Sequence, residues 1–130
     1  MSAKRSFFLT LVLVTAVTLA ALAQTAQAAE PLVGTAWLRQ HLQDKNLVVL
    51  DVFVGDHKKA FAAGHIPGAV YTDFSADGWR TTTNGVKGLL PPIKEAEKVI
   101  GKFGIDNDTC VVVVPGGREK ADFNASARVY

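Results

Sequence analysis

The stretch from Asn46 to Tyr71 constrains the fold of this chain more than any other. It opens with an apolar run, Leu47 to Leu50, that is followed directly by Asp51. The run is too short and too β-branched for a buried helix, so it predicts a buried strand. The next segment, Asp56 to Ala63, is polar and alanine-rich, and the Asp56 carboxylate can cap the start of a short helix. A buried strand followed at once by a helix predicts an α/β unit.

A tight turn completes this unit. Gly64 stands just past the expected helix, where a residue with positive φ is commonly needed. Pro67 and Gly68 fit the central positions of a type II turn, because proline presets φ and glycine tolerates the positive φ that follows. A second extended segment begins at Val70. The chain therefore predicts an α/β fold with a mostly parallel sheet flanked by helices.

These residues carry a family resemblance. A strand ending in aspartate, a short helix and the run Gly-His-Ile-Pro-Gly-Ala at residues 64–69 resemble the rhodanese (sulfurtransferase) family. The resemblance continues through residues 105–109 and a valine strand to residues 126–130, and so covers nearly all of the chain after residue 31. It is closer to the first, non-catalytic domain of two-domain thiosulfate or 3-mercaptopyruvate sulfurtransferases than to single-domain forms. The residues of this motif shape the backbone and carry no sulfur chemistry. They are Asp51, Gly64, His65, Pro67 and Gly68.

Two of these residues admit more than one interpretation. Asp51 ends the predicted strand, and ligands of open α/β sheets gather outside the carboxyl ends of strands. It is therefore either a carboxylate that lines a crevice or, as we favour, one that fixes the loop through hydrogen bonds to backbone N–H groups. His65 lies in a turn-rich stretch, where we expect hydrogen bonds to hold its ring and no catalytic role.

The first 28 residues have the organisation of a secretory signal peptide. Lys4 and Arg5 give a positive start, residues 7–23 are apolar apart from three threonines, and residues 26–28 form a small-x-small cleavage site. An uncleaved anchor is the alternative, but the apolar stretch is shorter than the roughly twenty residues that a membrane span needs. We expect cleavage after Ala28, a periplasmic or secreted protein, and no stable membrane association afterwards.

Composition then limits the remaining classes of function. Loss of Lys4 and Arg5 with the signal peptide lowers the number of lysines and arginines from 14 to 12. This number equals that of aspartates and glutamates, which is also 12. A neutral domain of mixed charge offers no argument for nucleic acid or for an anionic membrane. The single cysteine, Cys110, excludes an intramolecular disulfide, so packing of the core must hold the fold in an oxidising compartment.

The rest of the chain supplies the other elements of such a fold. We expect a helix over residues 35–43 capped by Thr35, a helix over 93–103 ended by Gly104, a central strand over 110–114, and a helix from Asn124. The helix over residues 93–103 should face the core through a stripe of apolar residues at helical spacing: Ile93, Ala96, Val99, Ile100 and Phe103.

Residues 72–88 form a polar, turn-rich connection that we interpret as a long functional or mobile loop without a hairpin. Trp79 and Arg80 are its unusual members. The pair is suited to binding an anion or to packing on another domain. The alternative is that Trp79 pins the loop to its own core.

The resemblance also implies where sulfur chemistry should lie. Rhodaneses carry a sulfane sulfur as a persulfide on a cysteine that follows a central strand, in a loop whose N–H groups stabilise the thiolate. The matching residue here is Pro115, which has neither a thiol nor an N–H donor. We therefore expect no catalytic residue in this chain. Cys110 precedes the strand, and we interpret it as a small buried hydrophobe.

The same loop contains the other candidate binding residues. Gly116, Gly117 and Arg118 resemble a small anion cradle made of backbone N–H groups and a guanidinium. A solvated loop is the alternative. The sequence has no zinc spacing, dinucleotide fingerprint or phosphate-binding loop, so we expect neither a metal nor a cofactor.

The functional expectation follows from the resemblance. Residues 29–130 would be an incomplete rhodanese-like domain, the N-terminal domain of an exported tandem protein. Its partners would be a small-molecule sulfur donor, a small-molecule acceptor and a second rhodanese domain of the same polypeptide that carries the catalytic cysteine. A non-catalytic binding module is the alternative.

Overall fold

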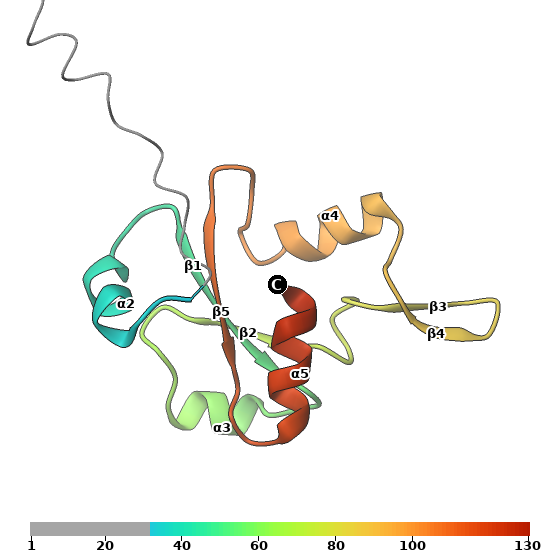
Figure 1. The fold of residues 1–130 in the computed structure, drawn as a ribbon, viewed down its shortest axis with the longest axis horizontal. Coiled ribbons are helices and arrows are strands. Elements are labelled where there is room, and N and C mark those ends of the chain that lie inside the picture. Colours follow the sequence, from blue (N-terminus) through green and yellow to red (C-terminus); the bar gives the residue numbers. More distant parts are fainter. Residues whose placement is uncertain (1–31) are drawn as a thin grey trace, which may run out of the picture. The chain divides into compact units, whose positions relative to one another are not determined.

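A parallel sheet lies at the centre of the folded unit formed by residues 34–130 (Figure 1). The computed structural model describes residues 32–130, so the predicted signal peptide lies outside the described residues. The sheet has the order β2-β1-β5. Its strands are β1 (Leu47–Phe53), β2 (Val70–Asp73) and β5 (Cys110–Pro115). This arrangement confirms the predicted α/β class with a parallel sheet.

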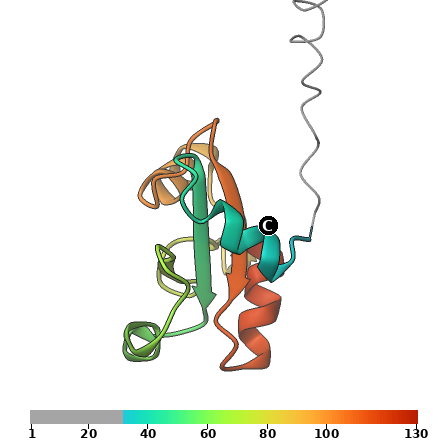
Figure 2. The ribbon, with the colours of Figure 1, turned by 90° about the vertical axis from the view of Figure 1, so that its left-hand side faces the viewer.

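In the described residues four helices accompany the sheet: α2 (Thr35–His41), α3 (Lys58–Ala63), α4 (Ile93–Gly101) and α5 (Lys120–Val129). The longest of them, α5, packs against β1 and β5, and Figure 2 shows it running beside both strands. None of the helices between residues 32 and 130 is long and apolar enough to cross a membrane.

The two faces of β1 bury different kinds of side chain, because successive residues of a strand point to opposite sides. Leu50 and Val52 are fully buried and form the main core with Trp79 of the following loop and Ala125 of α5. On the opposite face Phe53 stacks against Tyr71 and meets Phe61 of α3 edge to face. The core therefore has a mixed aliphatic and aromatic side that includes Ala125 of α5, and a second side where aromatic rings of β1, β2 and α3 pack together.

Two predictions about the sheet need correction. β1 runs two residues past Asp51, so this aspartate lies inside the strand and not at its end. β5 is an edge strand of the described sheet, and β1 takes the central place. The valines of β5 are all half-buried. A continuous apolar run indicates that both faces of a strand are covered by other elements. It does not indicate whether the strand lies at the centre or at the edge of its sheet.

The turn at Pro67 and Gly68 is confirmed, and the one at Gly64 is not. Gly68 has φ of 79°, and the Ala69 N–H donates to the Ile66 carbonyl at 2.9 Å, as a type II turn requires. Gly64 has φ of 175°, which is extended backbone open to any residue. Its N–H bonds the Phe61 carbonyl at 3.2 Å, so α3 ends without a left-handed residue.

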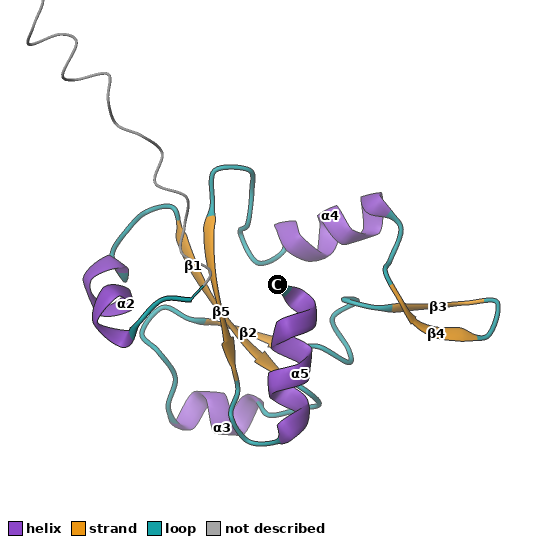
Figure 3. Ribbon diagram, viewed as in Figure 1, coloured by secondary structure: helices purple, strands orange, loops and turns teal. Residues whose placement is uncertain are grey.

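The connection after β2 contains a hairpin that was not predicted from the sequence. β3 (Thr81–Thr83) pairs antiparallel with β4 (Val86–Leu89), and Figure 3 shows this pair apart from the main sheet. Asn84 and Gly85 have φ of 53° and 79°, as in a type I′ turn. Strands with one buried face show an alternation of apolar and polar residues. This hairpin lacks the alternation because nearly every one of its residues is exposed.

Helix boundaries shift where the capping group differs from the expected one. α2 begins at Thr35 with Gly34 before it, and no side chain caps it. Asp56 accepts a hydrogen bond from the Lys58 N–H at 3.3 Å, although His57 holds the cap position of α3. α5 begins at Lys120, four residues before the expected Asn124, because a carboxylate within its first turn bonds the N–H groups at its start.

The predicted inner stripe of α4 is half right. Val99 and Phe103 pack against the core, but Ile93 is 78% exposed and Ile100 is also exposed. The helix ends at Gly101, and Gly104 then takes the predicted positive φ of 76°. Helical spacing predicted the correct inner face of α4. Only the carboxyl-terminal half of that face packs against the core.

Candidate functional site

The carboxyl ends of β1 and β5 lie together, and the segments that follow them form the candidate site. Pro115 pairs with Val52, and the Gly116 N–H donates to the Val52 carbonyl at 2.8 Å. A side chain on Gly116 would overlap the Phe53 ring. The loop after β5 therefore packs closely against β1, and only a glycine fits at its first position.

One buried carboxylate organises this loop from within. Asp122, in the first turn of α5, is fully buried and accepts hydrogen bonds from the N–H groups of Val54, Arg118 and Glu119 at 2.9, 2.9 and 3.1 Å. Burial alone would raise the pKa of Asp122, but these three hydrogen bonds lower it below its usual value. The protein thus supplies its own anion to the backbone donors at the start of α5.

Two backbone donors of the predicted anion cradle and its flank are turned inward. The Gly116 N–H is bonded to β1 and the Arg118 N–H to Asp122. Gly117 is exposed with φ of 70°, and the Arg118 side chain is exposed as well. Pro115, at the position that the resemblance assigns to the nucleophile, ends β5 and is half-buried. This loop offers no nucleophile.

Side chains of β2 fix the connection from β1 to α3 in a similar way. Asp73 accepts a hydrogen bond from the Gly55 N–H at 2.9 Å. The Tyr71 hydroxyl donates to the Gly55 carbonyl at 2.9 Å and accepts from the His57 N–H at 3.0 Å. Burial raises the pKa of Tyr71, so the hydroxyl keeps its proton and both hydrogen bonds at neutral pH.

Asp51 lies two residues before the carboxyl end of β1 and has a different environment. It is 7% exposed, between Tyr71 of β2 and Val114 of β5, and its Oδ1 finds no hydrogen-bond donor among the described residues. Burial raises its pKa, the charge of His65 opposes that rise, and the charge of Asp122 adds to it. A bond from this oxygen to the loop backbone, the interpretation favoured from sequence, is not formed.

The two histidines near this site contact aromatic rings and backbone of nearby residues. The His65 Nδ1 lies 2.8 Å from the Phe61 carbonyl, and its exposed ring stacks on Phe61 with centroids 4.0 Å apart. His57 is half-buried and stacks on Phe53 at 5.7 Å. His65 is thus held by a hydrogen bond, as expected for a turn-rich stretch.

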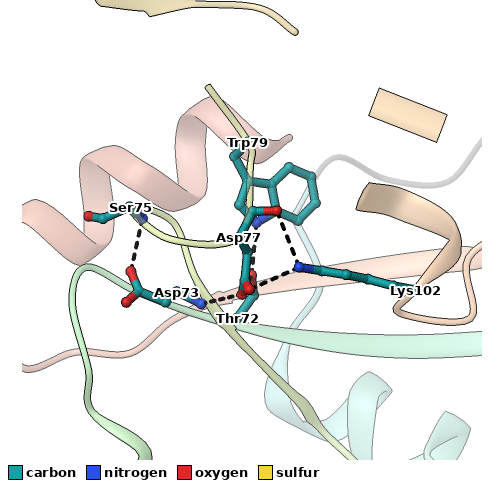
Figure 4. A network of polar contacts seen from close by, with 6 residues as sticks. All are labelled: Thr72, Asp73, Ser75, Asp77, Trp79 and Lys102. Atoms are coloured by element: carbon teal, nitrogen blue, oxygen red, sulfur yellow. Dashed lines mark hydrogen bonds and ion pairs between the residues drawn. The ribbon is translucent and has the colours of Figure 1, made fainter. Parts of the chain in front are cut away.

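Trp79 is part of the core. It is 9% exposed, its Nε1 donates to the Thr72 hydroxyl at 2.8 Å, and its ring stacks on Phe103 at 5.7 Å. Figure 4 shows Thr72 and Asp77 joined to Lys102 in one polar network. Burial opposes ionisation of Asp77, but the hydrogen bonds from Lys102 and Thr72 keep its pKa below the usual value. Trp79 therefore pins the loop after β2 to the core.

The two groups of predicted anion-binding residues are not brought together. Arg118 lies just before α5, whereas Arg80 donates to the carbonyl of Arg128 in the last turn of that helix. A helix of ten residues is about 15 Å long. Trp79 and Arg80 are thus remote from Gly116, Gly117 and Arg118, and they do not form one site.

Three important residues were not singled out from the sequence: Tyr71, Asp73 and Asp122. The usual helix-start signal is Ser, Thr, Asp or Asn followed three residues later by Glu. Here the order is reversed, with Glu119 at the cap and Asp122 three residues on. A search that also admitted the reversed order would have found Asp122.

The described part of the chain holds no group of three or more histidine, cysteine, aspartate or glutamate residues that could bind a metal. Cys110 is half-buried at the amino end of β5, so the length of that strand separates it from the loop after Pro115. Its thiol cannot replace the missing nucleophile of that loop.

Comparison with known proteins gives a consistent result. The model of the rhodanese-like domain matches residues 34–129. The sulfur carrier protein TtuD of Thermus thermophilus is 36% identical over 84 residues, which are 65% of this chain and 27% of that protein. A probable 3-mercaptopyruvate sulfurtransferase of Schizosaccharomyces pombe is 33% identical over 73 residues, 56% of this chain and 22% of that protein. The chain thus spans about a quarter of the length of these curated relatives. No solved structure matches.

Proposed function

Because this chain belongs to the rhodanese-like domain family, we propose that it is the N-terminal part of an exported sulfurtransferase and transfers no sulfur alone. A second domain of the longer protein would carry the catalytic cysteine. The donor would be thiosulfate or 3-mercaptopyruvate, and the acceptor a thiophilic small molecule. The observation that carries this proposal is Pro115 at the position that the resemblance assigns to the nucleophile, in a loop where the N–H groups of Arg118 and Glu119 already bind Asp122.

The chemistry makes clear what is missing. In sulfur transfer from thiosulfate, a cysteine thiolate attacks the outer sulfur, the S–S bond breaks, and sulfite leaves with the electron pair. The persulfide then gives its outer sulfur to cyanide, which releases thiocyanate and restores the thiolate. Both steps need a thiolate close to N–H donors. In this chain the Asp122 carboxylate accepts the hydrogen bonds of such N–H donors in place of a thiolate. The loop would therefore have a structural role and no catalytic one.

The first test is an assay of the purified chain with thiosulfate and cyanide. We expect no thiocyanate above the level found with the Cys110→Ser variant, because Cys110 lies at the far end of β5. Turnover that Cys110→Ser abolishes would contradict the proposal. The coding sequence past Tyr130 should also contain a cysteine directly after an apolar strand segment.

A non-catalytic binding module is the second candidate. It is favoured by Phe123, which follows Asp122 on α5 and is 71% exposed beside the closed loop. A large exposed aromatic residue next to a rigid loop suits the docking of another protein surface. Absence of a cysteine loop downstream, together with an inactive full-length protein, would decide for this candidate.

Export is a separate part of the proposal and rests on the sequence of residues 1–28. N-terminal sequencing of protein recovered from the exported fraction should begin at Ala29. A mature product that still carries residues 7–23 would contradict cleavage.

A further inference from the structure

Two arginines from distant parts of the chain meet at one aromatic ring. The guanidinium carbons of Arg80 and Arg128 lie 5.5 and 5.1 Å from the centre of the Phe74 ring. Arg80 donates to the carbonyls of Trp79 and Arg128 at 2.7 and 2.6 Å, and Arg128 reaches the Gly88 carbonyl at 3.4 Å. Backbone oxygens and the ring therefore hold both guanidiniums in place.

The positive charge at this ring is not balanced by an acid. Within residues 32–130 the ion pairs are Lys98 with Glu95 and Lys102 with Asp77, and neither arginine takes part in one. A guanidinium has five N–H donors, and the carbonyls use two from Arg80 and one from Arg128. The carbonyl end of α5 and the face of the ring offset part of the repulsion. Several donors still remain for an anion.

Exposed apolar side chains adjoin the arginines. Leu89 pairs with Thr81, the residue after Arg80, and is 40% exposed. Leu90 follows it and is 75% exposed. Arginine together with exposed apolar side chains is the composition of protein interfaces, where a desolvated guanidinium often carries much of the affinity. A free inorganic anion would gain nothing from the leucines.

We propose that Arg80 and Arg128 bind a carboxylate of an acidic, apolar segment of a protein partner, whose apolar side chains pack on Leu89 and Leu90. The planar fork of a guanidinium matches a carboxylate with two parallel hydrogen bonds. This surface does not depend on sulfur transfer. Its failure in a test would leave the proposed function untouched, and the reverse holds as well.

The test uses the full chain and an acetylated, amidated peptide Leu-Glu-Leu-Glu-Leu, with Leu-Gln-Leu-Gln-Leu as the matched peptide. We expect the first peptide to shift the Nε–H NMR signals of Arg80 and Arg128. Arg128→Gln should weaken binding at least about tenfold, since the charge-assisted hydrogen bonds from the guanidinium to the carboxylate are lost. Arg128→Lys should recover part of the loss, and Leu90→Ser should weaken binding several-fold. Arg39→Gln, at an exposed arginine of α2, is the control and should have no effect.

Three results would overturn the proposal. Equal binding of the glutamine peptide would exclude a carboxylate. Equal loss in Arg39→Gln would show that only net charge matters. Shifts with inorganic sulfate but not with the glutamate peptide would reduce the surface to a small-anion site. If Arg128→Gln does not fold, Arg128→Lys and Leu90→Ser decide the outcome, because the first keeps the charge and the second is an exposed change.

Discussion

Asp122 and Asp51 are both buried carboxylates close to the carboxyl edge of the sheet, yet their environments shift their pKa values in opposite directions. Asp122 accepts three backbone hydrogen bonds, and its pKa is lowered. The Oδ1 of Asp51 has no donor among residues 32–130, and its pKa is raised. The two carboxylates show that the hydrogen-bond donors around a buried acid decide the direction in which its pKa shifts, and that burial alone does not.

The backbone around each residue explains the difference. Asp122 lies in the first turn of a helix, where N–H groups have no partner within the helix and point toward its start. Asp51 lies inside a parallel strand, where the N–H groups are used between strands and the side chain stands perpendicular to them. A buried carboxylate is thus easily satisfied at a helix start and poorly satisfied on the face of a sheet.

The largest effect should come from Asp122→Asn. The amide keeps the shape of the side chain but loses the charge, and it turns an NH₂ group toward backbone N–H donors. We expect a decrease of about 3 kcal/mol or more in the free energy of unfolding, measured by urea denaturation. Asp108→Asn, at an exposed aspartate, should stay within about 0.5 kcal/mol. Equal midpoints for Asp122→Asn and the parent would remove its role in the loop.

A second variant, Gly116→Ala, tests whether packing also fixes the loop that Asp122 holds. The new methyl group would overlap the Phe53 ring. Overpacking of this kind costs about 1–3 kcal/mol. Gly34→Ala, where a side chain meets nothing within 4 Å, is the matched control for the change in backbone freedom. An unchanged urea midpoint for Gly116→Ala would mean that hydrogen bonds alone hold the loop.

The smallest effect should have the opposite sign. Asp51→Asn removes an acid that the fold buries without a donor for Oδ1, so we expect a gain of about 1 kcal/mol in unfolding free energy at pH values above the raised pKa of Asp51. Because the folded pKa of Asp51 lies above the ordinary 3.8, its carboxyl group favours folding below pH 3.8. This contribution is lost as the pH rises through the raised pKa.

Urea melts of Asp51→Asn and the parent across pH should therefore diverge as the pH rises above 3.8. Asp122 should behave in the reverse manner, since its lowered pKa contributes stability above 3.8 that is lost as the pH falls through the folded value. An Asp51→Asn variant that is less stable than the parent at pH values above the raised pKa would mean that a partner for the Asp51 charge exists.

Much of the fold was predictable because its signals are local. The apolar run from Leu47 predicted the buried strand β1, and Pro67 with Gly68 predicted a turn whose φ value confirms it. The run at residues 64–69 predicted the family, which the match over residues 34–129 confirms. The hairpin after β2 was missed, since its exposed faces leave no apolar alternation to detect.

The sequence by itself determined the turn at Pro67 and Gly68, because proline and glycine act through their own φ angles, and it determined that residue 115 offers neither a thiol nor an N–H donor. Only the tertiary structure decided where the buried charges find partners. Asp122 meets the N–H of Val54 across 68 residues of sequence, and Arg80 meets the carbonyl of Arg128 across 48. Such contacts depend on how strands and helices pack, and no pattern within a few residues records them.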